Sequence, residues 1–200
     1  MKKLFIVFDG IDGNGKTTQA MLLKEYLEKK GLKVLYASEP TESEYGKKIE
    51  NLLRKKFASK VSKEKWIELF TNDRKENEKR IKAALDSGQI VICDRYVYST
   101  LAYQLEEQEW QSYASSFLKP DIAFILDLPV ETALKRIKER CKKDKKKKAY
   151  FEKAQLLRKV RKKFLKLPIF LNHNIKIIDS TRTIEEIFHD IKEEVERLLD

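Results

Sequence analysis

The segment that most constrains this chain is its beginning, where residues 4–18 read LFIVFDGIDGNGKTT. An apolar run that favours β-structure leads into the pattern G-x-x-x-x-G-K-T, and apolar residues at helical spacing follow it. A strand before this pattern and a helix after it are the context in which it forms a phosphate-binding loop. Its glycines let backbone N–H groups face inward, and the helix N-terminus adds partial positive charge. We therefore predict a nucleotide-phosphate site made by Gly10, Ile11, Asp12, Gly13, Asn14, Gly15, Lys16, Thr17 and Thr18.

Two pairs of side chains give this prediction its chemistry. Lys16 can reach the β- and γ-phosphates of a nucleotide, and the Thr17 hydroxyl can ligate Mg²⁺. Asp94 and Arg95 directly follow a second apolar run, Ile90–Cys93. Asp94 can order the metal through a water molecule, and Arg95 can hold a phosphate with two parallel N–H bonds. The alternative for Asp94 and Arg95 is a surface pair that caps the next helix.

Five short apolar runs alternate with amphipathic segments, which predicts a parallel sheet covered by helices on both sides. The expected strands are Leu4–Phe8, Lys33–Ala37, Ile90–Cys93, Ile122–Asp127 and Lys176–Ile178. The expected helices span about 16–30, 45–56, 63–87, 97–117, 130–143, 152–172 and 184–199. Ser62 is expected to cap one helix, and Thr183 with Glu186 to form a capping box for the last. The 200 residues are therefore expected to form one α/β/α domain around a five-stranded parallel sheet.

The net charge of +11 favours anionic partners, which include nucleotides, nucleic acid and anionic membranes. Much of the excess lies in residues 135–166, where the lysine run 142–148 has a solvated segment as its alternative explanation. Cys93 and Cys141 lie far apart, so a disulfide framework is not indicated and a reducing, cytoplasmic location is expected. No apolar stretch has the length needed to span a bilayer.

Other candidate residues have less specific patterns. Arg136 and Arg140 lie four residues apart on one helix face, where they can hold phosphates, stack on a base or be solvated. Phe70 can be a base-stacking platform, but an aromatic residue in a long helix is more often part of the core. Tyr103 and Gln104 can be ordinary helix surface, and residues 179–182 can be a turn.

Taken together, these pieces resemble the thymidylate kinase family over nearly the whole chain. The string DRYVYSTLAYQ, residues 94–104, is similar to the family pattern D-R-[YH]-x-x-S-x-x-A-Y-Q and is the most specific match. FDGIDGNGKTTQ, Glu39-Pro40-Thr41 and the L-F-x-x-x-R string that ends at Arg74 resemble further family elements. The family's helix and lid resemble ALKRIKER, residues 133–140, and Phe151-Glu152. The loop before its last helix resembles Ile178-Asp179-Ser180-Thr181.

This resemblance implies the nucleoside monophosphate kinase type of fold and phosphoryl transfer from ATP to dTMP, which gives dTDP, with Mg²⁺. It implies that Asp12 meets the deoxyribose or the metal, Phe70 stacks on thymine and Arg74 binds the carbonyl edge of the base. Arg95 would bridge the donor and acceptor phosphates. The acceptor pocket would also include Pro40, Ser99, Tyr103 and Gln104, and the ATP site would include Arg136, Arg140 and Thr181. A homodimer and a lid at about residues 141–153 are further expectations from the family.

The chain departs from the family pattern at three places. Ser38 stands where many bacterial members have an arginine, and Gly13 stands where one subgroup has a catalytic arginine. Ala149-Tyr150 stands at a lid position that is often Asp-Arg. A cation must still neutralise the transferring phosphoryl group. We therefore predict that Lys147 or Lys148 reaches the phosphates when the lid closes; a solvated basic loop is the alternative.

Three rival functions stay open at this point. Another small nucleoside or nucleotide kinase would use the same loop and sheet. A GTPase switch is disfavoured because the sequence has no N-K-x-D element to read guanine. A basic nucleic-acid-binding ATPase that uses the run 142–148 predicts steeply salt-dependent binding, but nucleic acid is not the expected partner.

Overall fold

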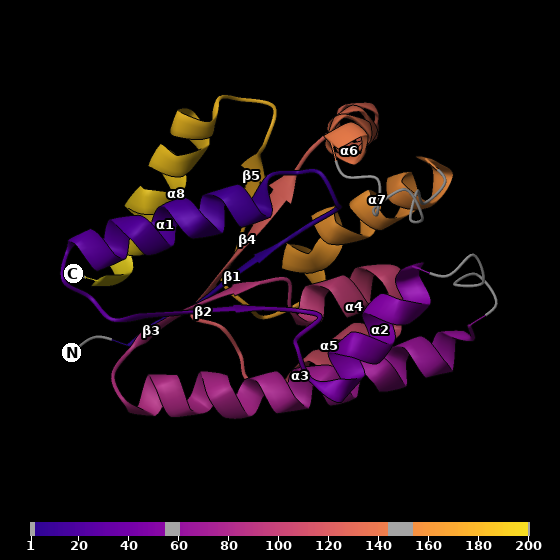
Figure 1. Ribbon diagram of the computed structural model, residues 1–200, viewed down its shortest axis with the longest axis horizontal. Coiled ribbons are helices and arrows are strands. Elements are labelled where there is room, and N and C mark those ends of the chain that lie inside the picture. The colour runs from indigo at the N-terminus through magenta and orange to yellow at the C-terminus, as the bar shows by residue number, and fades with distance from the viewer. Residues whose placement is uncertain (1–2, 55–60, 144–153, 200) are drawn as a thin grey trace.

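The computed structural model describes residues 3–54, 61–143 and 154–199, with the side chains of 140–143 excepted. In this part of the chain a parallel sheet runs through the centre with helices on both sides (Figure 1). The strands are β1 (Phe5–Asp9), β2 (Val34–Ser38), β3 (Ile90–Asp94), β4 (Ile122–Asp127) and β5 (Ile175–Asp179). Their order in the sheet is β2-β3-β1-β4-β5. The expected five-stranded α/β/α fold is therefore confirmed.

The helices are α1 (Lys16–Lys29), α2 (Glu44–Arg54), α3 (Lys63–Asp86), α4 (Val97–Gln104), α5 (Trp110–Ser115), α6 (Val130–Lys143), α7 (Ala154–Phe170) and α8 (Ile184–Leu199). Helices α1 and α8 cover one face of the sheet, and α3, α4 and α7 cover the other (Figure 1). None of the helices in the described ranges has the length and apolar composition that a membrane crossing needs.

Alternation along the central strands creates two separate cores. In β1, Ile6 and Phe8 pack with α1 and α8, whereas Phe5 and Val7 pack with α4 and α7. All five residues of β1 are buried, which is why its sequence is continuously apolar until the final aspartate. Both faces of the sheet are thus fixed by apolar burial, and the polar residues gather where the strands end.

The capping predictions are confirmed. The Ser62 hydroxyl accepts a hydrogen bond of 3.2 Å from the Lys65 amide at the start of α3. At the start of α8, the Glu186 carboxylate accepts from the Thr183 amide at 2.9 Å, and the Thr183 hydroxyl accepts from the Glu186 amide at 3.2 Å. Gly31, just after α1, has φ +78°, the left-handed conformation typical of a helix C-terminus.

The prediction of one helix over residues 97–117 is wrong. Helix α4 ends at Gln104, a 3₁₀ turn covers Glu107–Glu109, and α5 begins at Trp110. Leu105 is extended, and the Trp110 indole donates to the Leu101 carbonyl at 3.1 Å, which folds the second helix back on the first. The apolar spacing continues through this corner, so periodicity alone did not reveal it.

Candidate active site

The loop between β1 and α1 is preformed. Gly10 has φ +129°, and a Cβ there would lie 2.7 Å from the Leu126 carbonyl oxygen, so only glycine fits. The side-chain amide of Asn14 donates to the same carbonyl at 2.9 Å and ties the loop to the end of β4. The Lys16 ammonium donates to the carbonyls of Ile11 and Gly10 at 3.3 and 3.4 Å. The loop therefore holds its lysine inside its own curve, as a phosphate site requires.

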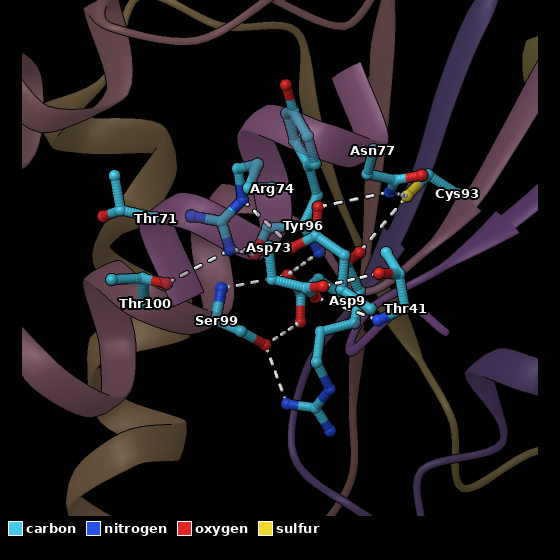
Figure 2. A network of polar contacts seen from close by, with 12 residues as sticks. Asp9, Thr41, Thr71, Asp73, Arg74, Asn77, Cys93, Tyr96, Ser99 and Thr100 are labelled. Carbon is cyan, nitrogen blue, oxygen red and sulfur yellow. Dashed lines mark hydrogen bonds and ion pairs between the residues drawn. The ribbon is translucent and has the colours of Figure 1, made fainter. Parts of the chain in front are cut away.

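Beneath this loop lies a carboxylate that sequence reasoning missed. Asp9 is fully buried and accepts hydrogen bonds from the amides of Gly10, Ser99 and Tyr96 at 2.8, 2.9 and 3.1 Å. The Ser99 hydroxyl donates a fourth, at 2.7 Å (Figure 2). Burial raises the pKa of Asp9, and the charge of Arg95 opposes this effect. Asp9 fastens α4 to the end of β1; its position at a strand end, directly before the first glycine of the loop, was the signal available in the sequence.

A cluster of three charged side chains lies above Asp9. The Arg95 guanidinium pairs with the Asp12 carboxylate and also donates to the Ser99 hydroxyl at 2.8 Å. The Lys16 ammonium lies 3.6 Å from the same Asp12 carboxylate. Burial acts to raise the pKa of Asp12, but the charges of Arg95 and Lys16 lower it overall. Burial and the charge of Arg95 lower the pKa of Lys16. Asp12 thus stands between two cations, and its side chain is 41% exposed.

The backbone of Arg95 is unusual. Its φ of +74° makes it the non-glycine residue with a left-handed conformation among the residues described. The Arg95 amide donates to the Phe8 carbonyl at 2.8 Å, which continues the pairing of β3 with β1. This turn directs the guanidinium from the end of β3 towards the phosphate loop.

The residues predicted to bind a metal are adjacent. The Thr17 hydroxyl donates to Asp94 Oδ2 at 2.5 Å, and the Tyr36 hydroxyl donates to the same oxygen at 3.1 Å. No group of three or more His, Cys, Asp or Glu side chains suited to a metal is found in the described ranges. Mg²⁺ prefers oxygen ligands and is commonly held by one or two carboxylates together with nucleotide phosphates. The oxygen donors of Thr17 and Asp94, beside the phosphate loop, fit such an ion.

On the other side of α4 lies a buried ion pair. Arg74 donates to Glu39 Oε2 from Nε and Nη2 at 3.0 and 2.8 Å, and each side chain is 1% exposed. Arg74 also donates to the Tyr113 hydroxyl at 3.2 Å. It donates to the Thr100 hydroxyl at the same distance (Figure 2). Burial raises the pKa of Glu39 to about 7, against the lowering effect of the Arg74 charge. Glu39 precedes Pro40 through a cis peptide bond. The predicted contact of Arg74 with a base stays a prediction.

Other predicted acceptor residues lie on α3 and α4. Phe70 lies one turn before Arg74 on α3, is half-buried, and has its ring centroid 5.9 Å from that of Trp66. Tyr103 and Gln104 end α4 and are half-buried, and the Arg95 guanidinium lies 6.0 Å from the Tyr103 ring centroid. Phe70 and Tyr103 therefore belong to two helices that pack against each other, α3 and α4.

The loop that carries Pro40 is held by a second carboxylate that the sequence did not single out for this role. Asp73 accepts from the Thr41 amide at 2.9 Å, the Thr41 hydroxyl at 2.5 Å and the Ser43 hydroxyl at 2.6 Å. Asp73 is 1% exposed, so these bonds are shielded from water. The segment after β2 is thus fixed to α3 next to Arg74.

A hollow of about 480 Å³ opens beside the phosphate loop, and residues of α1, α6 and α8 line it. Arg136 reaches it from α6 and donates to the Ser180 carbonyl at 3.4 Å. Arg182, which sequence reasoning did not name individually, reaches it from the last loop and pairs with Asp190 at 2.5 Å. The residues that line the hollow are Gly13, Asn14, Gly15, Thr18, Gln19, Arg136, Glu139, Arg182, Ile184 and Ile187.

Some predicted residues are not part of this hollow or lie outside the described residues. Thr181 is exposed, and its amide and hydroxyl both donate to Asp179, at 2.9 and 2.8 Å, in a local turn. The side chain of Arg140 and the whole of Lys147 and Lys148 lie outside the described residues. Their predicted roles stay predictions.

Comparison with known proteins agrees with the family resemblance of the sequence. The family described as thymidylate kinase matches residues 8–191. The chain is 44% identical to a probable thymidylate kinase of Pyrococcus horikoshii over 200 residues, which cover 96% of this chain and 95% of that protein. It is 42% identical to a probable thymidylate kinase of Pyrococcus abyssi, with the same coverage. It is 38% identical to a thymidylate kinase of Desulfotalea psychrophila over 97% of this chain and 95% of that protein.

Proposed function

The chain belongs to the thymidylate kinase family, and from this premise we propose that it transfers the γ-phosphoryl group of ATP to dTMP, giving dTDP and ADP. The observation that carries the proposal is the cluster of Lys16, Asp12 and Arg95, which places two cations at the phosphate loop around one half-exposed carboxylate. Phosphoryl transfer needs cations at the phosphates more than it needs acid–base groups. The cluster offers that arrangement.

The donor side is the phosphate loop with the adjoining hollow. The backbone amides of the loop and Lys16 hold the phosphates of ATP, and the hollow receives the nucleoside. Arg136 supports this assignment because a planar guanidinium can stack on a base. Arg140 and Thr181 remain part of the proposed donor site through the family resemblance.

The acceptor side lies between β2, α3 and α4. Phe70 stacks on thymine, Arg74 reads its carbonyl edge, and Pro40 and Gln104 close the pocket. Tyr103 and Asp12 meet the deoxyribose. The support is that Arg74 and the loop after β2 are fixed by buried bonds, so the pocket is rigid before substrate arrives. Arg95 lies between this pocket and the phosphate loop, and Ser99 holds its guanidinium in place.

The charge cluster suggests how the site responds to substrates. Without phosphates, Asp12 pairs with both Lys16 and Arg95 and offsets part of their positive charge. Phosphates that enter the site take over both cations, and Asp12 is then free to accept from a sugar hydroxyl. Bound Mg²⁺, for which Thr17 and Asp94 provide oxygen ligands, supplies further neutralisation of phosphate charge. A phosphate oxygen of dTMP is already ionised at neutral pH, so the attack requires no general base.

The remaining cation is assigned to the lid, at about residues 141–153, where Lys147 or Lys148 reaches the phosphates on closure. Arg161 is the next residue to test for this role. Its guanidinium makes two bonds of 2.6 and 2.7 Å with Asp127 at the end of β4, which keeps it at the same edge of the sheet as the loop. We also propose one domain with this lid, a homodimer and a cytoplasmic location.

A panel of acceptors tests the proposal. Purified protein is incubated with ATP and Mg²⁺ and with dTMP, dUMP, dCMP, AMP or thymidine, and the phosphorylated product is quantified. We expect dTMP to be preferred. Preference for thymidine or AMP would indicate another small kinase, and turnover that requires nucleic acid would indicate a nucleic-acid-dependent ATPase.

A further inference from the structure

The edge strand β2 brings a tyrosine to the proposed metal site. Tyr36 is paired in register with Ile92, and Ser38 with Asp94. Side chains two residues apart on a strand point to the same face, so Tyr36, Ser38 and Asp94 all face α1. The Tyr36 ring packs against the core beneath α1, and only its hydroxyl extends to the end of the strand.

The tyrosine hydroxyl contacts the carboxylate that is assigned to the metal. It donates to Asp94 Oδ2 at 3.1 Å, and the Thr17 hydroxyl donates to that same oxygen at 2.5 Å. Two donors from different elements, β2 and α1, fix the rotation of the carboxylate. Thr17 has a second task, because its oxygen is itself a proposed metal ligand. Tyr36 is then the donor that holds Asp94 without ligating the ion.

This arrangement also bears on position 38. Ser38 is exposed and is paired with Asp94 in the sheet, and its side chain is much shorter than that of an arginine. The polar contact from β2 to the site comes instead from two residues earlier, through the longer tyrosine side chain.

We propose that Tyr36 is a positioning residue for the metal: by donating to Asp94 Oδ2 it orients the carboxylate that orders Mg²⁺ beside Thr17. The inference rests on the proposed function. Partners that hydrogen-bond to metal-binding groups fix their orientation, and their loss weakens metal binding. Removal of this hydroxyl therefore weakens the binding of nucleotide with Mg²⁺ and leaves the binding of metal-free nucleotide unchanged.

The test is calorimetric titration of the full-length protein with ADP, in Mg²⁺ and in EDTA. The variant is Tyr36→Phe, which keeps the packed ring and removes only the hydroxyl. We expect the enhancement of ADP affinity by Mg²⁺ to fall about tenfold, at the lower end for loss of such a partner. The affinity in EDTA and the unfolding temperature in EDTA should equal those of the wild type.

A matched control is Tyr26→Phe. Tyr26 lies on α1 and also donates its hydroxyl to a carboxylate, that of Glu196 on α8. It should leave the Mg²⁺ enhancement unchanged. In an Asp94→Asn background, Tyr36→Phe should have no additional effect, because the group through which it acts is already altered.

Two results would overturn the inference. One is an unchanged Mg²⁺ enhancement in Tyr36→Phe. The other is an equal loss of affinity in Mg²⁺ and in EDTA, which would mean that the hydroxyl only supports the fold. Both results leave the proposed function intact, because that is decided by the acceptor panel with wild-type protein. A wild-type protein that binds no ADP in Mg²⁺ would contradict both.

Discussion

Two arginine–carboxylate pairs stand on either side of α4, and they differ in their access to solvent. In the pair of Arg95 and Asp12, the side chains are 18% and 41% exposed. In the pair of Arg74 and Glu39, each is 1% exposed. An exposed ion pair is weak and can exchange partners, whereas a buried one is costly to break. The first pair is therefore suited to meet incoming phosphates, and the second to frame a pocket of fixed shape.

The largest expected effect tests the buried pair of Arg74 and Glu39. Arg74→Met removes the cation and leaves the Glu39 carboxylate buried without its partner. We expect the free energy of unfolding to fall by about 3–5 kcal/mol, the range for removal of one member of a buried pair. Urea denaturation measures it. The double variant with Glu39→Leu should recover part of the loss; if the double is no more stable than the single variant, the pair does not account for the effect.

The next effect tests Lys16, which lies with Asp12 and Arg95 in the partly exposed cluster. Lys16→Ala should nearly abolish phosphoryl transfer, because loss of one preorganised charge contact in such a site costs on the order of 3 kcal/mol or more. The fold should survive, since burial already disfavours the charge of Lys16. Steady-state rates and circular dichroism measure the two properties. Near-normal turnover in a folded Lys16→Ala variant would remove the phosphate-loop assignment.

Arg95 offers a sharper contrast with Arg74, because activity should fall without a loss of stability. Arg95→Gly relieves a left-handed backbone, so the free energy of unfolding should stay equal or rise by up to about 1 kcal/mol. Turnover should fall about 10²- to 10³-fold. Thermal melts and rates are compared across the same preparations.

Arg95→Lys is the companion variant, and it should restore activity only in part because a point charge cannot reproduce the planar fork. Full activity in this variant would argue against two-point phosphate binding.

A smaller effect is expected at Phe70, in the proposed acceptor site. Phe70→Ala should raise the KM for dTMP much more than that for ATP, because stacking of a base on an aromatic ring is worth roughly 1–3 kcal/mol. Initial rates with each substrate varied separately give both constants. Loss of thermal stability without an acceptor-selective change would show that Phe70 is merely part of the core with Trp66.

The smallest effect concerns the proposed lid, at about residues 141–153. Replacement of Lys146, Lys147 and Lys148 by Gln should lower kcat roughly tenfold at saturating substrates, at the low end for removal of a cation. A triple variant at three exposed lysines of α3 and α7, Lys82, Lys159 and Lys162, serves as the control for net charge. If the triple lid variant keeps the wild-type kcat at low and moderate salt, these lysines are not the catalytic cation, and Arg140 or Arg161 is the next to test.

The comparison of the two pairs also shows what the sequence could and could not predict. The phosphate loop, the sheet and the placement of Asp94 and Arg95 followed from local patterns: a glycine-rich loop, continuously apolar runs and strand ends. The pairing of Arg74 with Glu39 joins residues 35 positions apart and depends on how α3 packs on β2, which no local pattern specifies. The hydrogen bond from Tyr36 to Asp94 depends on the register of β2 against β3, and the break after Gln104 depends on the Trp110 indole. Tertiary packing decided each of these.

The most direct measurement of the central claim is ³¹P NMR of wild-type protein with ATP, Mg²⁺ and dTMP, with Lys16→Ala and Arg95→Gly measured in parallel. The account predicts that the signals of ATP and dTMP decline together while those of ADP and dTDP grow in equal amounts, and that both variants are nearly inactive. ATP that is hydrolysed to inorganic phosphate without formation of dTDP, or dTDP that forms at the wild-type rate in both variants, would contradict it.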